Sequence, residues 1–264
     1  MAGIYAIELT NHCNAKCDFC PHDKMGRDKG FILMQGIEIC IDYMLRQGQK
    51  YVALHHMGEP LLHKDLFEIL KKFADAGIDT EFSTNGMLLD KFYEMPIMGQ
   101  TGCEIQQPAL STLLKRLRIS VDYFYSTPRY LDKVKEFLDW AQVFCPELKV
   151  HIHTIKGHDL SMFEKYNVVL EHKIFDNWAG KVEGVSQLPK TDNCYFINYN
   201  YVVVAWDGRI LKCCMDTDAE HVKGNIYTNG LETLSPNTRC SCICASCASM
   251  QFANGGEWDK IRRD

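Results

Sequence analysis

Three thiols lie on one short segment near the start of the sequence. Cys13, Cys17 and Cys20 fall within eight residues, directly after the alternating apolar run 4–9, which contains Glu8. Such a run predicts a β-strand, so we expect the thiols on one loop at its carboxyl end. An electron-carrying four-iron cluster normally takes four cysteines. Three cysteines would therefore leave one iron open to another ligand.

The spacing of this loop resembles a known family signature. C-x3-C-x2-C, with Phe19 directly before the last cysteine, is similar to the loop of the radical S-adenosylmethionine (SAM) enzymes. The resemblance implies a [4Fe–4S] cluster on the three thiolates that binds SAM and cleaves it reductively to a 5′-deoxyadenosyl radical, which abstracts a substrate hydrogen. Zinc is the alternative, but zinc loops usually have paired cysteine arms and four ligands. The next cysteine is Cys40.

A second motif follows the second apolar run. Gly58-Glu59-Pro60 resembles the Gly-Gly-Glu-Pro motif of the family, with Met57 in place of its first glycine. A glycine permits close backbone approach, and a carboxylate suits a cation. The resemblance implies that these residues bind the ammonium group of SAM. An ordinary turn is the alternative for so short a motif.

Further short motifs follow later strands in the family's order. They resemble a Thr-Asn-Gly turn and a Ser-x-Asp turn near SAM, and Arg129 is a candidate for the SAM carboxylate. Each is also compatible with a simple turn or a solvated side chain. The residues that the resemblance assigns to SAM binding here are Ser83, Thr84, Asn85, Ser120, Asp122 and Arg129.

Strand and helix signals alternate along the first 180 residues. Apolar runs predict strands at 4–9, 51–56, 79–83, 117–121, 149–154 and 168–175, and helical spacing predicts helices at 35–47, 64–76 and 131–143. This order predicts an α/β fold with a parallel sheet. Residues 94–111 interrupt it with prolines and glycines, as functional loops do.

Two consecutive predicted strands have one polar face. Arg118, Ser120 and Asp122 share a face of the fourth strand, and His151 and His153 share a face of the fifth. Buried parallel strands are usually apolar on both faces. We therefore expect a barrel or partial barrel whose interior holds a ligand, with its chemistry at the carboxyl ends of the strands. Solvated edge strands are the alternative.

The C-terminal third is rich in cysteine. A β-hairpin is predicted around Asp207-Gly208, and the order of cysteines and glycines from 194 to 247 resembles the SPASM and shortened twitch auxiliary domains of the same superfamily. The resemblance implies one auxiliary [4Fe–4S] cluster, a four-cysteine zinc site being the alternative. Its expected ligands are Cys194, Cys213, Cys244 and Cys247, with Cys240 and Cys242 as rivals.

These signals predict a two-domain chain. We expect a partial (β/α)6 radical SAM barrel over 1–180 and a small auxiliary-cluster domain over 181–264. The formal charge of −5 disfavours a nucleic-acid partner. Thirteen cysteines, an odd number, do not suit a disulfide scaffold. The absence of a signal peptide or long apolar segment predicts a soluble, cytoplasmic protein without a membrane partner.

The resemblance favours oxidation of a small polar molecule. In that scheme the auxiliary cluster accepts an electron, a flavodoxin- or ferredoxin-like reductant feeds the first cluster, and the substrate contacts are Arg118, His151, His153 and Trp178. A peptide maturase or epimerase, acting on a ribosomal peptide or a sugar, is the alternative. Cys103 or Cys214 would then donate hydrogen, although the chain shows no domain for a leader peptide. A non-catalytic iron–sulfur or zinc protein is a third hypothesis.

Overall fold

The computed structural model describes residues 2–93, 110–173, 177–183, 194–228, 230–238, 243–244 and 247. It divides into two compact units, which are Met1–Gly58 with Phe175–Asp264, and Glu59–Ile174. The boundary predicted after residue 180 falls inside the first unit and stays a prediction. No helix in the described ranges is long and apolar enough to cross a membrane.

The first unit combines the N-terminal strands with the C-terminal hairpin. Its strand order is β2-β1-β7-β8-β9, in which β1 pairs in parallel with β2 and β7, and the remaining pairs are antiparallel. The strands are β1 (Gly3–Ile7), β2 (Tyr51–Ala53), β7 (Tyr201–Val204), β8 (Arg209–Leu211) and β9 (Val222–Asn225). The hairpin therefore extends the sheet that carries the cysteine loop.

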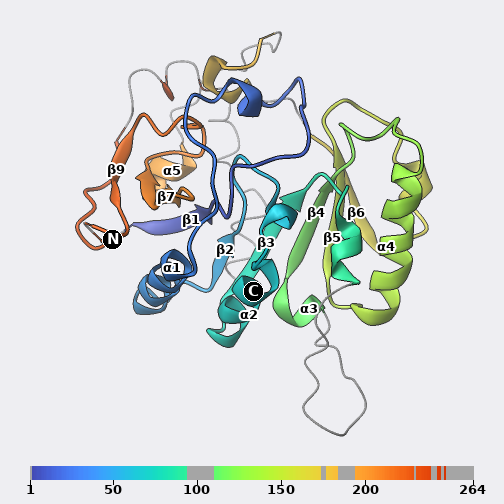
Figure 1. Cartoon of the computed structure of the whole chain (residues 1–264), viewed down its shortest axis with the longest axis horizontal. Coiled ribbons are helices and arrows are strands. Elements are labelled where there is room, and N and C mark those ends of the chain that lie inside the picture. The colour runs from blue at the N-terminus through green and yellow to red at the C-terminus, as the bar shows by residue number, and fades with distance from the viewer. Residues whose placement is uncertain are drawn as a thin grey trace, which may run out of the picture. The chain divides into compact units, whose positions relative to one another are not determined.

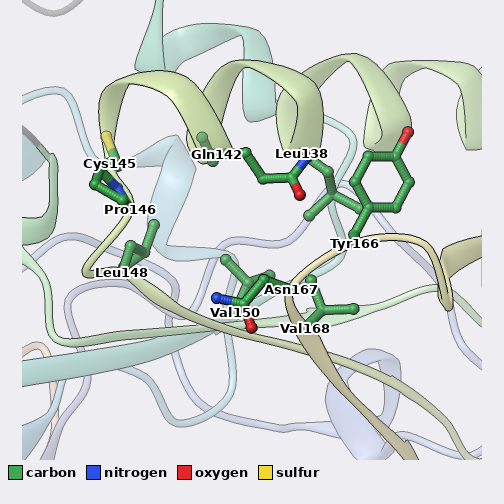
Figure 2. A pocket seen from close by; sticks show the side chains of 10 residues that line it. Leu138, Gln142, Cys145, Pro146, Leu148, Val150, Tyr166, Asn167 and Val168 are labelled. Atoms are coloured by element: carbon green, nitrogen blue, oxygen red, sulfur yellow. The ribbon is translucent and has the colours of Figure 1, made fainter.

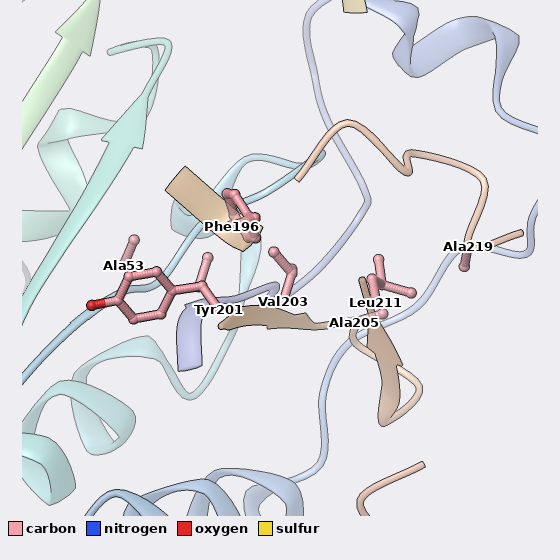
Figure 3. Close-up of a cluster of buried hydrophobic side chains, with 8 residues drawn as sticks. Ala53, Phe196, Tyr201, Val203, Ala205, Leu211 and Ala219 are labelled. Atoms are coloured by element: carbon pink, nitrogen blue, oxygen red, sulfur yellow. The ribbon is translucent and has the colours of Figure 1, made fainter. Parts of the chain in front are cut away.

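The core of this unit is shared by both ends of the chain. Figure 3 shows Phe196, Tyr201 and Val203 packed near Ala53, and Ala6 belongs to the same buried cluster. The helices of the unit are α1 (Met34–Arg46), α5 (Tyr195–Asn198), η1 (Pro21–Lys24) and η5 (Trp178–Gly180). Because apolar burial contributes about 25 cal/mol per Å², this shared core attaches the C-terminal segment to the N-terminal strands together with the pairing of β1 and β7.

The second unit is a parallel sheet of order β6-β5-β4-β3. Its elements are β3 (Asp79–Thr84), β4 (Arg116–Ser120), β5 (Lys149–Thr154), β6 (Val168–His172), α2 (Leu66–Asp75), α3 (Leu110–Leu113), α4 (Tyr130–Phe144), η2 (Pro60–Leu62), η3 (Leu89–Phe92) and η4 (Ser161–Phe163). Figure 1 shows α4 lying beside β5 and β6. In α2 the predicted apolar stripe, Leu66, Ile69, Leu70 and Phe73, is buried.

Most predicted elements are present within two residues of their expected ends, and two strands are shorter. The strand predicted at 51–56 ends at Ala53 because the following backbone turns His56 toward Glu8 and Cys214. The strand predicted at 168–175 ends at His172, and 174–176 lie outside the described residues. The irregular loop predicted at 94–111 lies almost wholly outside them as well.

Candidate functional site

The cysteine loop follows β1 and is tied to residues 28–30 by side chains. The Thr10 hydroxyl donates to the Gly30 carbonyl oxygen at 2.7 Å. The Asn11 amide donates to the Asp28 carbonyl at 2.8 Å and accepts from the Gly30 N–H at 2.9 Å. These bonds hold the backbone that leads into Cys13 in one conformation.

Glu8 forms a buried charged network at the base of this loop. Its carboxylate accepts two hydrogen bonds from the Arg27 guanidinium, at 2.7 and 2.5 Å, and lies 3.3 Å from His56 Nδ1. Burial alone would raise the pKa of Glu8, but the bonds from Arg27 and His56 outweigh it and lower the pKa to about 2. The His56 ring also bonds the Cys214 carbonyl at 2.7 Å. The network thus joins the start of the cysteine loop to the C-terminal cysteine segment.

The three N-terminal thiols are half-buried on one loop, and Cys13 lies near Cys20. The Cys20 N–H donates to the Cys17 carbonyl at 3.1 Å, and the Ala15 N–H approaches Cys13 Sγ at 3.4 Å. Burial, with smaller contributions from the nearby Cys13 and Asp23, raises the pKa of Cys20 to about 11. Neighbouring thiolates repel one another, and a bound cation stabilises them. This donor set therefore fits a cationic iron–sulfur cluster.

Gly58 packs directly on the cysteine loop. A Cβ at this position would lie 2.2 Å from the Thr10 carbonyl oxygen and 2.7 Å from the His12 carbonyl oxygen. Met57, which replaces a family glycine, is buried, and its N–H points to Glu8 at 3.3 Å. The close approach in this motif is therefore at Gly58.

In the second unit, Glu59 is buried and bound by backbone N–H groups. Its carboxylate accepts from Leu61 at 3.0 Å and from Asn85 at 2.8 Å. Burial raises the pKa of Glu59 to about 7, against the lowering effect of those bonds. Pro60 begins η2 directly after it. Glu59 thus connects the second motif with the Thr-Asn-Gly turn and holds a carboxylate that a bound cation would ionise.

Tyr130 links the next two motifs. Its hydroxyl donates to the carbonyl oxygen of Asn85 at 2.8 Å and lies 3.3 Å from that of Ser120. The Thr84 hydroxyl accepts from the Gly86 N–H at 3.1 Å, which closes the turn after β3. Ser83 is half-buried near the end of β3. The sequence contains no signal that would have selected Tyr130.

Asp122 has many partners within its own unit. Its carboxylate accepts from the Thr154 hydroxyl at 2.7 Å and from the N–H groups of Ile155 and Lys156 at 3.0 and 2.8 Å. These bonds fix the turn after β5. Arg129 is exposed, with φ of 62° at the residue before α4. A role for either residue in SAM binding stays a prediction.

Several polar side chains on β3 to β6 pair with one another. Arg118 lies 3.6 Å from Glu81 and 3.3 Å from Glu171, and the His151 ring bonds Glu171 at 2.8 Å. The bond from His151, helped by the charges of Lys173 and Arg118, lowers the pKa of Glu171 to about 2 against the effect of burial. His153 is buried on the same face. Sequence reasoning identified the basic residues of this face but missed Glu81 and Glu171, each of which is the acidic partner of one of them. The ligand-filled cavity expected at this face stays a prediction.

Four C-terminal cysteines, including Cys214, are grouped with apolar side chains. Cys247, Cys213 and Cys194 belong to or pack on one buried cluster with Met215 and Ile243. Burial raises the pKa of Cys194, and nearby Cys213 and Cys244 raise it further. All four predicted auxiliary ligands thus gather in one place. Across the described residues, no group of three or more His, Cys, Asp or Glu side chains is arranged so that it could hold a metal ion.

The remaining predicted cysteines differ in position. Cys214 packs beside both apolar clusters of the first unit, whereas Cys103, Cys240 and Cys242 lie outside the described residues. A separate cavity of about 200 Å³ between α4, β5 and β6 is lined by buried Cys145, as Figure 2 shows. Small-molecule sites usually exceed about 300 Å³, so we assign no ligand to it.

A three-cysteine loop at the end of a parallel strand, inside an α/β fold, defines an iron–sulfur enzyme of the SAM-cleaving class. The sequence profile of the Radical SAM superfamily matches residues 7–166. The chain belongs to this superfamily, whose members use a [4Fe–4S] cluster and SAM.

Curated relatives cover part of the chain. A protein of Methanothermobacter marburgensis described as "Probable GTP 3',8-cyclase" is 26% identical over 202 residues, which are 71% of this chain and 58% of that protein. A protein of the same description from Methanocaldococcus jannaschii is 29% identical over 137 residues, or 50% of this chain and 44% of that protein. The chain therefore spans less than two thirds of these relatives.

Solved structures match more of the chain. BtrN in complex with AdoMet and 2-DOIA superimposes with a TM-score of 0.61 at 16% identity, over 98% of this chain and 91% of BtrN. The enzyme anSMEcpe with bound AdoMet gives a TM-score of 0.54 at 14% identity, over 88% and 79% of the two chains. At such identities the likeness establishes the fold, a mixed α/β radical SAM fold with a parallel sheet.

Proposed function

We propose that this radical SAM enzyme is a dehydrogenase of a small polar molecule, with a second cluster bound by Cys194, Cys213, Cys244 and Cys247. The observation that carries the proposal is the gathering of these cysteines within one unit, next to the apolar cluster around Met215. A closed set of cysteine ligands suits an electron acceptor, because it leaves no iron open to SAM.

The chain's own residues account for assembly of the first cluster site. Cys13, Cys17 and Cys20 would hold the cluster, which with bound SAM supplies a carbon radical that removes hydrogen from a substrate carbon. Glu8 and Arg27 hold the strand end from which the loop leaves. Glu59, with its raised pKa, binds the ammonium of SAM and releases its own proton as it does so.

The proposed oxidation balances in atoms and electrons. The substrate carbinol carbon loses a hydrogen atom to the radical, its hydroxyl loses a proton to a base, and the remaining electron passes to the second cluster. A carbonyl forms, and the product is lighter by two hydrogens. Arg118, His151, His153 and Trp178 remain proposed substrate contacts, although the first two already pair with Glu171. The cyclase activity named for the relatives is not carried over, since the chain spans only 58% and 44% of them.

Iron and sulfide counts test the two sites separately. We expect about eight irons in the reconstituted wild type and about four in a Cys13/Cys17/Cys20 triple alanine variant. A variant with alanine at the four C-terminal cysteines should also hold about four. Cys145→Ala, at a buried thiol of the second unit, is the matched control. No iron in the triple variant would refute the auxiliary cluster and, with it, oxidation by this route.

Product mass distinguishes the reaction types. A dehydrogenase yields 5′-deoxyadenosine together with a product two hydrogens lighter. An epimerase or a hydrogen-returning maturase leaves the substrate mass unchanged in water and incorporates deuterium from heavy water. Cys17→Ala should abolish 5′-deoxyadenosine formation under either scheme, and continued formation would contradict the assignment of the cysteine loop.

A further inference from the structure

The turn that contains η5 contacts the N-terminal cysteine loop. The indole N–H of Trp178 donates to the Phe19 carbonyl oxygen at 3.1 Å. That carbonyl belongs to the peptide unit whose N–H is that of Cys20, and this N–H donates to the Cys17 carbonyl at 3.1 Å. Trp178 therefore bonds the peptide unit between Phe19 and Cys20. Cys20 is one predicted cluster ligand, and the N–H of this peptide unit bonds the backbone of a second, Cys17.

The same side chain contacts the C-terminal cysteine group. Trp178 packs on the buried cluster of Met215, Ile243 and Cys247, on which Cys213 also packs. A single indole thus has its polar edge on one cysteine group and its apolar surface on the other. Tryptophan is suited to such a position, because it combines a large apolar surface with one hydrogen-bond donor.

The backbone of this turn is in an unusual conformation. Trp178, Ala179 and Gly180 have φ values of 49°, 54° and 89°, and the left-handed region is unfavourable for residues other than glycine. Asn177 is buried, and its carbonyl oxygen accepts from the N–H groups of Gly180 and Val182 at 3.0 and 3.1 Å. Such conformations persist only where the surroundings enforce them.

Two lysines attach the turn to both loops. Lys24, just after Cys20, donates to the Lys181 carbonyl oxygen at 3.2 Å. The Lys181 ammonium donates to the Thr217 hydroxyl at 2.8 Å and pairs with Asp218, both in the loop after Cys213. Both contacts are made by Lys181, directly after the turn, so the C-terminal end of the turn is attached to both cysteine-bearing segments.

We propose that Trp178 is a positioning residue that links the N-terminal cysteine loop to the C-terminal cysteine group. Its N–H orients the Cys20 peptide unit, and its ring shields the C-terminal group from water. The second half of this inference rests on the proposed auxiliary cluster. The first half rests only on the radical SAM cluster loop.

Two substitutions separate the two contacts. Trp178→Phe keeps an aromatic ring but removes the N–H donor, whereas Trp178→Ala removes both. Trp140→Phe is the matched control, because Trp140 lies on α4 in the second unit among Tyr93, Phe137 and Phe144. Each substitution is made in the triple-alanine and the quadruple-alanine cysteine backgrounds, so that each cluster is observed alone.

The first readout is the rate of iron loss to a chelator. Removing one hydrogen bond changes an equilibrium about fivefold, so Trp178→Phe should accelerate loss from the N-terminal cluster about fivefold and leave the C-terminal cluster within about twofold. Trp178→Ala should accelerate both. An N-terminal rate in Trp178→Phe that matches Trp140→Phe would overturn the anchoring role.

The second readout needs no iron. In the apo-protein, Trp178→Ala should increase the alkylation rate of Cys213 and Cys247, measured by mass spectrometry of the labelled peptides, while Trp140→Phe leaves it unchanged. Equal rates in wild type and Trp178→Ala would overturn the shielding role. If the triple-alanine background binds no iron, the auxiliary cluster is refuted, yet this alkylation result still decides the position of Trp178.

Discussion

Gly58→Ala is the substitution whose consequence follows most directly from the structure. A Cβ at Gly58 would lie 2.2 Å from the Thr10 carbonyl oxygen, whereas ordinary contact begins at 3.4 Å, so 3.4 − 2.2 = 1.2 Å of separation is missing. The obstructing atoms belong to the backbone of Thr10 and His12, and no side-chain rotation relieves the overlap. The cysteine loop itself must therefore move.

That movement is opposed by the bonds that fix the loop. Thr10 and Asn11 are tied to Asp28 and Gly30 by three hydrogen bonds. Overpacking in such a setting costs about 1–3 kcal/mol, and we expect the upper end because backbone must shift. Cys13 follows two residues after Asn11, so the spacing of the three thiols changes as well.

The assay combines stability with cluster content. In the background without the four C-terminal cysteines, Gly58→Ala should lower the urea unfolding free energy by about 3 kcal/mol and hold clearly fewer than the expected four or so irons. Gly26→Ala is the matched control, since a Cβ there meets nothing within 4 Å. A Gly58→Ala variant that equals Gly26→Ala in both stability and iron would refute the close approach.

Other predictions concern buried carboxylates. Arg27→Met leaves Glu8 buried without its main partner and should lower the free energy of unfolding in urea titrations by about 3–5 kcal/mol. Adding Glu8→Gln should recover part of this loss. A double variant that is less stable than Arg27→Met alone would argue against the pair. The pKa of Glu8 is about 2 in the folded protein, against an ordinary value of 4.5. This difference stabilises the fold by about 3 kcal/mol above pH 4.5, and the stabilisation is lost as the pH falls toward 2. The double variant should lack this dependence of stability on pH. Glu59 acts in the opposite direction, because its folded pKa of about 7 makes the stability of the apo-protein fall as the pH rises from 4.5 to 7. Glu59→Gln should remove this dependence of stability on pH, and it should weaken SAM binding in calorimetry. A pH dependence that persists in this variant would belong to another group.

Local sequence patterns identified the elements and the first cysteine group. Residues 149–154 form β5 as expected, and the apolar stripe of α2 faces the core. These features depend on periodicity and on neighbours within a few residues. The cysteine loop was identified in the same way, because its three thiols and Phe19 are adjacent in the chain.

Pairing between distant residues was not predictable from the sequence. Nothing near residue 201 indicates that β7 joins β1 in parallel, because pairing partners far apart in the chain leave no local pattern. Likewise, Arg118 and His151 were visible as basic residues, whereas their pairing with Glu171 across adjacent strands required the register. The ion pairs on this face were missed for that reason, and the ligand cavity expected there stays a prediction.

The sequence by itself determined the class of chemistry, because the ligand spacing of Cys13, Cys17 and Cys20 and the residues of the later motifs are adjacent in the chain. Only the tertiary structure decided which distant groups meet. It brought Cys194 to Cys213 and Cys244, joined Glu8 to Arg27, and set Trp178 against both cysteine groups. Contacts of this kind depend on how the strands pair and how the core packs, and neither is encoded in a local pattern.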